Sequence, residues 1–590
     1  MTVVEDVYEP LPLYRDVFRD KFRENAEAFF GELVAKSGVD VPANAATVRE
    51  VRAIAAELEK AEAARAGWGW AIGLSIAALV ALAVAFFAIA SEDGTDAAGT
   101  LAALGGGAVA LLPLLFGVFV PKYRHYKEVA QAVKARLDEK KAVAWGQMAP
   151  LNALFDWDAA AKIIEKTVPR LSFDPFFTQG RLTELHDLFG WSDAFNEGKS
   201  VLGAQSGEIN GNPFVFGRLL QMDWGVKTYS GSREVSWTET ERDAEGKLRT
   251  VRRYQTLTAY VDKPIPEYSQ DVLLIYGNDA APKLTFTRSP SGLSDAGNGF
   301  FGRMRMKSQV KSLERFSRNL DDQYGYTIMG NREFEALFET RDRSDEVEYR
   351  LLFTPLAQKQ MLELIKDRTV GYGDDFSFVK ANKINVIRAA HLSNSDLDTN
   401  PAKFADFDFE AIRSKFLSFC ENYFKSTYFA LAPLLSIPLY QQTRTHADIY
   451  RDVYSRRSSF WEHESLANYL GEHRFRHPAS VTRNILKTQV ARRDGDVATV
   501  AVTAYGYRTE PRVDVVSVRA NNGRYYDVDV HWDEYLPVSQ TTNIRATERE
   551  GLSKPDFDLA LQTNEDWQNF FRSWNADGAQ AAFRRSIISF

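Results

Sequence analysis

One alternating segment near the C-terminus has residue types that could bind a metal ion. Successive side chains of a strand point to opposite faces, so the predicted strand Tyr525–Asp533 gathers its polar residues on one face. These are Asp527, Asp529, His531 and Asp533. Carboxylates and an imidazole in a row suit a hard cation, which prefers several oxygen ligands close together. The competing interpretation, which we favour, is the solvated face of an ordinary half-buried strand.

A second group of potential ligands is the histidine-rich stretch that precedes this segment. It contains Glu462, His463, Glu464, Glu472, His473 and His477. His473 and His477 would be neighbours on a helix, but Pro478 interrupts helical structure and the HExxH spacing of zinc proteases is absent. We therefore expect ordinary surface histidines here.

Other patterns with chemical meaning are equally weak. Gly297–Gly302 has GxGxxG spacing but follows a loop, and no parallel βαβ unit surrounds it, so we expect a flexible loop. Cys420, the single cysteine, lies among aromatic residues on a predicted helix, which favours a buried small residue over a nucleophile. We expect no catalytic, cofactor-binding or metal-binding residues and no cofactor.

Aromatic residues of the C-terminal region could instead form a recognition surface, since such side chains dominate binding hot spots. They are Tyr505, Tyr507, Tyr525, Tyr526, Trp532 and Tyr535. Nucleic acid is not an expected partner, because 72 Lys and Arg against 79 Asp and Glu give a net charge of −7 and no global basic field.

The elements that position these residues begin with two apolar runs. Trp68–Ala90 is an uncharged run of 23 residues and Leu101–Val120 one of 20, and a helix needs roughly 20 to cross a bilayer. The linker Ser91–Gly99 carries only acidic charges, whereas a basic cluster from Lys122 to Lys141 follows the second run. The positive-inside rule then predicts a multi-pass protein of the bacterial inner membrane, with both termini in the cytoplasm.

Amphipathic helices flank the two spans. One predicted face consists of Val51, Ile54, Leu58 and Ala61, and the other of Tyr126, Val129, Val133 and Leu137. An antiparallel hairpin would pack these faces into a short stalk, with Glu57, Glu59 and Glu62 opposite Lys127, Lys134 and Arg136. A role for the basic cluster in binding anionic lipid is the alternative.

The rest of the chain predicts a mixture of helices and antiparallel strands. Lys227–Glu241 and Leu248–Asp262 alternate as a long hairpin, Val347–Phe353 predicts a strand, and Phe376–Ala381 with Lys383–Ala389 predicts a strand pair. Four short strands follow, at Ser480–Ala491, Val497–Tyr507, Arg512–Ala520 and Tyr525–Trp532, and then closing helices at Asp566–Trp574 and Ala579–Ile588.

The predicted fold class is therefore a membrane-anchored α+β protein. It has an N-terminal two-helix transmembrane hairpin with a helical stalk, a cytoplasmic mixed α+β domain with antiparallel sheets, and a C-terminal antiparallel β module. The predicted domains are N-terminal cytoplasmic helices at 1–66, the hairpin at 67–121 (spans about 68–90 and 101–120), a basic stalk and connector at 122–200, the α+β domain at 201–440 and the β module at 441–590.

Three stretches resemble a known bacterial family. Gly207–Phe214, which leads into aromatic strands, and Val347–Leu356 with Met361–Leu364 resemble the two-transmembrane family catalogued as domain of unknown function 3137. The resemblance extends from the hairpin to about residue 400. It implies a bacterial inner-membrane protein with a cytoplasmic α+β domain, and it carries over no catalytic residues.

These observations favour a tethered binding or scaffold protein over an enzyme, because no nucleophile motif, metal signature or phosphate loop is present. We expect the lipid bilayer and a protein as partners, and a homo-oligomer stays open. One alternative is a membrane-anchored metal-dependent enzyme that uses the Asp527, Asp529, His531 and Asp533 face. A second is a pore or transporter subunit, although neither span carries an ionisable residue.

Overall fold

The computed structural model describes residues 7–90, 98–242, 247–293, 300–318, 326–443, 457–495, 497–548 and 586–589. The chain divides into two compact units. The body unit comprises Met1–Asn25, Asp158–Thr399 and Glu421–Phe590, and the hairpin unit comprises Ala26–Trp157 and Asn400–Cys420. Each unit is described by itself.

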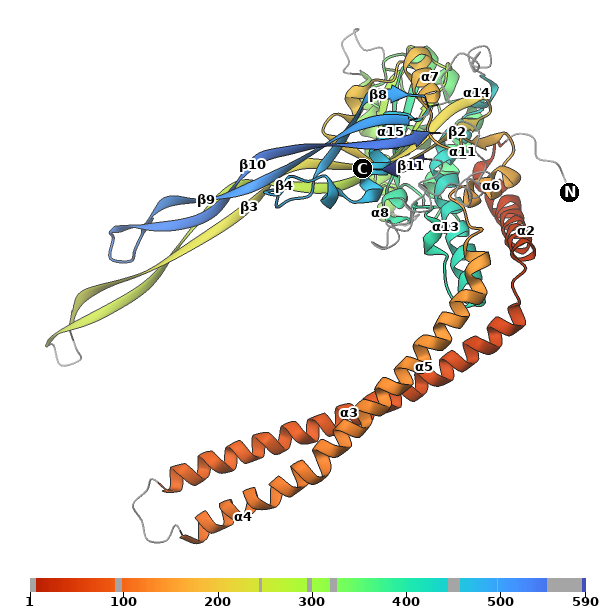
Figure 1. The fold of residues 1–590 in the computed structure, drawn as a ribbon. Coiled ribbons are helices and arrows are strands. Elements are labelled where there is room, and N and C mark those ends of the chain that lie inside the picture. The colour runs from red at the N-terminus through yellow and green to blue at the C-terminus, as the bar shows by residue number, and fades with distance from the viewer. Residues whose placement is uncertain are drawn as a thin grey trace. The chain divides into compact units, whose positions relative to one another are not determined.

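Long helices form the hairpin unit. They are α3 (Val41–Ala90), α4 (Ala98–Leu114), the π-helical turn η2 (Leu115–Phe119) and α5 (Val120–Asn152). Figure 1 shows α3 and α5 crossing side by side. Pro113 lies inside α4 just before η2, which is consistent with a helix that widens where proline removes a backbone donor.

The stalk contacts expected from the sequence are present between α3 and α5. Val51, Ile54 and Leu137 are buried against one another, with Leu58 and Val133 packed at the margin. Two ion pairs flank this apolar seam: Arg136 with Glu57 at 3.6 Å and Lys140 with Glu50 at 2.7 Å. The predicted pairing of acidic α3 with basic α5 is therefore confirmed at Glu57 and Arg136.

Two helices of the hairpin unit are long and apolar enough to cross a membrane, Val41–Ile89 and Leu104–Asn152. Only 6% of the apolar stretch of each is buried. Trp70, Val84 and Phe87 are each more than 60% exposed on α3, and Val109 and Phe116 are similarly exposed in the return helix. A core helix of a soluble protein would instead hide such side chains.

The body unit is built around an antiparallel sheet of seven strands among the described residues, in the order β1-β2-β3-β4-β7-β6-β5. The strands are β1 (Leu171–Phe173), β2 (Lys199–Ile209), β3 (Asn212–Arg242), β4 (Leu248–Gly277), β5 (Thr285–Arg288), β6 (Phe376–Ala381) and β7 (Ile384–Ala389). One core cluster lies between this sheet and the helices α7 and α15, and it includes Phe177, Leu185, Leu273 and Trp461.

A second antiparallel sheet has the order β11-β10-β9-β8. Its strands are β8 (Ile485–Asp494), β9 (Val497–Arg519), β10 (Tyr525–Glu548) and β11 (Ser586–Ser589). The remaining helices are α1 (Pro10–Leu13), α2 (Arg19–Ser37), α6 (Ala159–Thr167), α7 (Gln179–Phe189), α8 (Phe300–Arg318), α9 (Arg332–Phe338), α10 (Glu346–Leu352), α11 (Pro355–Lys366), α12 (Ala390–Asn394), α13 (Phe409–Leu435), α14 (Pro438–Gln442) and α15 (Phe460–Leu470), with short turns η1 (Tyr14–Phe18), η3 (Asp193–Asn196), η5 (Pro401–Lys403) and η7 (Glu472–Arg474).

Two long β-ribbons leave these sheets and run together (Figure 1). Beyond Gln221, β3 pairs only with β4, in unbroken register to Arg242 opposite Leu248. This two-stranded stretch of roughly 20 residues per strand is about 65 Å long at ~3.3 Å per residue. The β9–β10 ribbon packs on it over the buried side chains of Val235, Leu257, Val528 and Val530. We call the two-stranded parts of these ribbons, residues 222–242 with 247–268 and 506–538, the arm.

Several expectations are corrected. Val347–Phe353 is not a strand but forms most of α10, which the Asp345 side chain caps by accepting the Glu348 N–H. Tyr349 and Leu352, three residues apart, form its buried face, which is helical spacing. The predicted strands Val497–Tyr507 and Arg512–Ala520 are one strand, β9, because Pro511 is accommodated within the ribbon.

The body unit extends across residue 441, where the predicted β module begins. The body unit includes both the predicted α+β domain and the C-terminal module, since β9–β10 packs on β3–β4 and α15 packs on β2. Ser586–Ser589, which overlaps the end of the closing helix predicted at Ala579–Ile588, is the strand β11. The helix predicted at Asp566–Trp574 lies outside the described residues.

Candidate functional site

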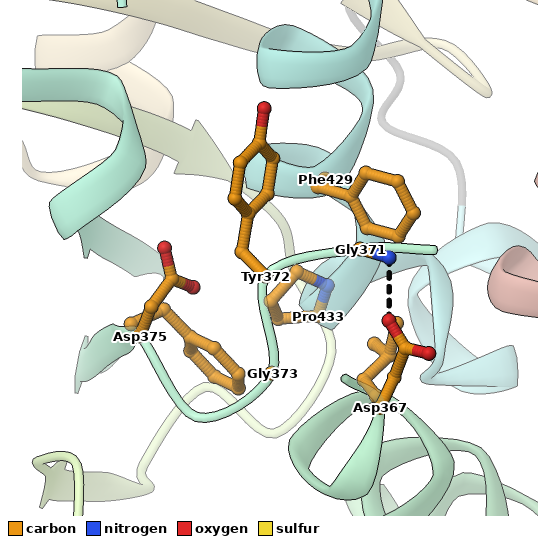
Figure 2. A pocket seen from close by; sticks show the side chains of 9 residues that line it. Asp367, Gly371, Tyr372, Gly373, Asp375, Phe429 and Pro433 are labelled. Carbon is orange, nitrogen blue, oxygen red and sulfur yellow. Dashed lines mark hydrogen bonds between the residues drawn. The ribbon is translucent and has the colours of Figure 1, made fainter. Parts of the chain in front are cut away.

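A small pocket in the body unit lies where the loop after α11 meets β6 and the second half of α13 (Figure 2). Its lining consists of Leu364, Asp367, Gly371, Tyr372, Gly373, Asp375, Phe376, Phe429 and Pro433. The free volume is about 10 Å³, and a cavity of this size holds about one water molecule. It is too small for an organic substrate.

The shape of the pocket follows from its glycines. The Asp367 carboxylate accepts hydrogen bonds from the backbone N–H groups of Val370 and Gly371, which folds the loop back on the end of α11. A Cβ on Gly371 would overlap the Phe429 ring, and Gly373 has φ +70°, a conformation that favours glycine. The loop is therefore held close against α13.

An aspartate–histidine pair lies at the edge of this pocket. Asp375 Oδ2 lies 2.5 Å from His391 Nδ1 and accepts the His391 backbone N–H at 3.1 Å. His391 Nε2 lies 3.0 Å from the Ser426 carbonyl oxygen. The imidazole is buried and stacks on the Tyr372 ring with centroids 3.9 Å apart. Burial also raises the pKa of Tyr372.

Two serine hydroxyls close to this pair are not in position for nucleophilic catalysis. Ser395 Oγ and Ser426 Oγ lie 2.7 Å apart, and Tyr372 OH is 3.3 Å from Ser426 Oγ. An activated serine needs its hydroxyl hydrogen-bonded to the imidazole, but both ring nitrogens of His391 are already engaged by Asp375 and a carbonyl. These hydrogen bonds hold α12 and α13 against the sheet.

Sequence reasoning missed this pair, although a signal existed. Asp375 directly precedes β6, and His391 lies two residues after β7. The two strands form an antiparallel hairpin, so the residues that flank its open end meet, and Ala390 N–H donates to the Asp375 carbonyl at 2.8 Å. The predicted strand pair Phe376–Ala381 and Lys383–Ala389 already implied this proximity.

The carboxylate row of β10 is placed as the alternation predicts. Tyr526, Val528, Val530 and Trp532 face the other ribbon, and the opposite face is exposed. The exposed side chains are Asp527, Asp529, His531 and Asp533. In the part of the chain that the structure describes, no group of three or more His, Cys, Asp or Glu side chains is placed to hold a metal ion.

The expectation of surface histidines holds only in part: His473 is exposed and His477 is half-buried, whereas His463 is buried. His463 is buried in α15, and the neighbouring carboxylates serve the backbone: Glu462 accepts from Phe177 N–H at 2.8 Å and Glu464 from Val201 N–H at 3.0 Å. Burial raises the pKa of Glu464, and the Lys487 ammonium, 2.8 Å from its carboxylate, opposes this rise. These groups fix α15 on β2.

The other histidines and singled-out residues have structural places. His473 lies in η7 with Glu472, and His477 Nδ1 accepts the Ala479 N–H. Cys420 is buried, as predicted. Gly297–Gly299 of the glycine motif lie outside the described residues.

Polar contacts lock the two ribbons of the arm together. Lys263 Nζ is 2.6 Å from Asp514 Oδ2 and 4.0 Å above the Trp532 ring, whose Nε1–H donates to Asp514 Oδ1 at 2.8 Å. These neighbours lower the pKa of Asp514, through the hydrogen bonds from Lys263 and Trp532 first. Arg233 additionally donates to the Asp527 carbonyl at 2.7 Å.

The outer faces of the arm are exposed and carry large side chains. On β4, Tyr254 and Tyr260 are 62% and 66% exposed, and on β9 Val515 is 62% exposed. The predicted aromatic surface is only partly present, since Tyr505 and Tyr525 are exposed but the other four are half-buried. The arm therefore offers a long, wide surface, whereas the described pocket offers almost no volume.

Comparison of the chain with protein-family models, curated proteins and solved structures gives no match.

Proposed function

We propose that the chain is a bacterial inner-membrane protein whose two-span hairpin tethers a cytoplasmic α+β body, and that this body binds another macromolecule through the arm. The arm is the observation that carries the binding role. It projects two packed ribbons about 65 Å in length, at ~3.3 Å per residue, with exposed aromatic side chains.

The tether is supported by the exposed apolar surface of the hairpin unit. Two adjacent helices that each leave an apolar stretch unburied would be insoluble in water and stable in hydrocarbon. The acidic linker and the basic cluster after the second helix favour cytoplasmic termini. The resemblance to the two-transmembrane family agrees with this placement.

A binding role fits the arm better than catalysis fits the pocket. Catalysis needs a concave, substrate-sized site, and the pocket beside Asp375 accommodates about one water molecule. Tethering raises the effective concentration of the arm near the membrane, so that weak contacts with a membrane-associated partner suffice.

Site-specific photo-crosslinking of the full chain in native membranes tests the binding role. A photoreactive residue at Tyr254 or Tyr260 should give a discrete adduct identifiable by mass spectrometry. Val347, which is 78% exposed on α10, provides the matched control position. Adducts that form equally well from Val347, or none from the arm, would rule out the arm as the binding element.

The tether has its own test. The full chain should stay in the membrane pellet after alkaline carbonate extraction, and a fluorescent protein fused after Phe590 should be fluorescent, as expected for a cytoplasmic C-terminus. Release by carbonate would contradict membrane insertion.

A further inference from the structure

A group of cations lies at the membrane-proximal end of the stalk. Trp68 contacts Phe119 with ring centroids 5.8 Å apart, and Tyr123 lies within 3.5 Å of where a Cβ of Gly69 would be. These contacts bring the start of the first apolar run and the end of the second to the same level of the hairpin. Arg65 on α3 and Lys122, Arg124 and Lys127 on α5 lie just outside that level.

These four cations, which we call the collar, outnumber the carboxylates close to them in the sequence. Ala63–Ala90 and Val120–Lys127 contain no acidic residue. Among the described residues, no collar side chain forms an ion pair with a carboxylate, whereas Arg136 and Lys140, further along α5, pair with Glu57 and Glu50. Lys122, Arg124 and Lys127 are also exposed. Glu62 and Glu128 are the acidic residues nearest to the collar on α3 and α5, and neither forms an ion pair with a collar cation among the described residues. The collar therefore keeps a net positive charge.

Aromatic residues surround the same level. Trp68, Trp70, Tyr123 and Tyr126 occupy it, and Trp and Tyr are enriched where a membrane protein crosses from hydrocarbon to headgroups. The rings would fix the depth of the hairpin, and the cations would then lie at the height of the lipid phosphates. Each Lys or Arg placed near an anionic membrane surface increases the affinity for that surface about fivefold.

We propose that the collar is a binding site for the headgroups of anionic phospholipids, which it selects over zwitterionic ones. This inference rests on the proposed membrane insertion of the hairpin. Orientation by the positive-inside rule needs only the sign of the charge, whereas headgroup binding also needs cations that are free of carboxylates and held at one level by aromatic contacts.

Native mass spectrometry of the full chain in detergent tests the proposal. The wild-type chain should bind phosphatidylglycerol at least tenfold more tightly than phosphatidylcholine with the same acyl chains. In K122Q/R124Q/K127Q this preference should fall to within about threefold, since three cations at about fivefold each are lost. The charge-preserving K122R/R124K/K127R should keep the preference, which controls for misfolding.

A matched control removes the same charge elsewhere on α5. Lys134 lies seven residues beyond Lys127, the nearest collar cation, roughly 10 Å along the helix at 1.5 Å per residue, and the Debye length is about 8 Å at physiological salt. K134Q/K140Q/K141Q should therefore keep the preference for phosphatidylglycerol. An equal loss of the phosphatidylglycerol preference in both triple variants, or no preference in the wild type, would overturn the proposal that the collar binds anionic headgroups.

Two further experiments separate related explanations. Excess inorganic phosphate should not displace phosphatidylglycerol; displacement would identify a free-phosphate site and overturn the lipid assignment. Alkaline carbonate extraction of the same chain shows whether the hairpin is inserted at all. A chain that stays in the membrane after carbonate extraction but has no lipid preference would refute headgroup binding by the collar alone. A chain that carbonate releases would refute the proposed membrane insertion of the hairpin.

Discussion

The main chain of Gly231 in β3 lies directly against the carbonyl oxygen of Asp529 in β10. A Cβ on Gly231 would overlap that oxygen and lie 2.9 Å from the Asp529 carbonyl carbon and 3.1 Å from Val530 Cα. The atoms in conflict are backbone, which cannot swing aside as the end of a flexible side chain would. The two ribbons of the arm can therefore pack closely only because residue 231 has no side chain.

Gly231→Ala should separate the ribbons locally and destabilise the arm, by roughly 1–3 kcal/mol, the usual cost of overpacking. Limited proteolysis should then cut within β9–β10 sooner than in the wild type. Ser230→Ala provides the control, because Ser230 is exposed and its neighbour across the ribbon, Tyr260, points to solvent. Equal proteolysis of the two variants would show that close ribbon packing does not depend on Gly231.

The sequence predicted the strands of the arm well but not their continuity. Alternation identified Lys227–Glu241 and Leu248–Asp262 as a hairpin, and the register confirms it. It began the hairpin only at Lys227, although β3 runs from Asn212 through Gly225, and it placed a break before Arg512, where Pro511 lies. Gly and Pro usually end central strands, yet a ribbon with free edges accommodates both without losing a required hydrogen bond.

The packing of one ribbon on the other could not be predicted, because alternation gives the apolar face of a strand and not its partner. Val528 and Val530 were assigned correctly to one face, but their contact with Leu257 joins segments more than 250 residues apart. The Asp375–His391 pair is the opposite case. Its two residues flank one predicted hairpin, so their proximity could have been predicted from the sequence.

A serine-directed fluorophosphonate should not label Ser395 or Ser426. Labelling requires an imidazole nitrogen that can accept the hydroxyl proton, and His391 directs Nδ1 to Asp375 and Nε2 to the Ser426 carbonyl. Mass spectrometry of tryptic peptides after treatment of the purified chain measures this. Stoichiometric labelling of either serine that is lost in His391→Gln would show that the imidazole is a catalytic base.

Asp375→Asn should lower stability by about 1–3 kcal/mol, because the carboxylate accepts from both the ring and the backbone of His391 and a buried donor is left without its charged partner. Thermal unfolding in detergent measures the change. Asp374 does not provide a suitable control, since it pairs with the buried Arg288. Asp187, which is exposed on α7, serves better, and Asp187→Asn should unfold within a degree or two of the wild type.

The stability of the stalk should depend on the apolar contacts between α3 and α5 and not on the ion pairs that flank them. Ile54 is 7% exposed against Val51 and Leu137, so Ile54→Ala should cost about 2–5 kcal/mol locally. Glu50→Gln removes an exposed pair with Lys140 and should have no measurable effect. Hydrogen exchange of α3 and α5 distinguishes the two variants, and faster exchange in Glu50→Gln than in Ile54→Ala would reverse this ranking.

The body unit contains one lysine whose burial should make stability depend on pH. Lys380 in β6 is 1% exposed and donates to the carbonyls of Ala280 at 3.0 Å and Asn382 at 2.5 Å. Burial lowers its pKa to about 7 from an ordinary value of 10.5, and the attraction of Glu348 opposes this only in part. Between these two pH values the unfolded chain binds a proton that the folded chain does not.

The free energy of unfolding contributed by Lys380 should therefore rise with pH from about 7 to about 10.5 and then level off, by up to about 5 kcal/mol over the window. Below pH 7 both states hold the proton and the slope disappears. Lys380→Met removes the titrating group, so its Tm should change less with pH than that of the wild type in this interval, whatever the variant does to absolute stability. Lys383→Met, at a half-exposed lysine of the same hairpin, should keep the wild-type slope. Identical slopes for wild type and Lys380→Met would show that Lys380 stays charged in the folded chain, held by its two carbonyl acceptors.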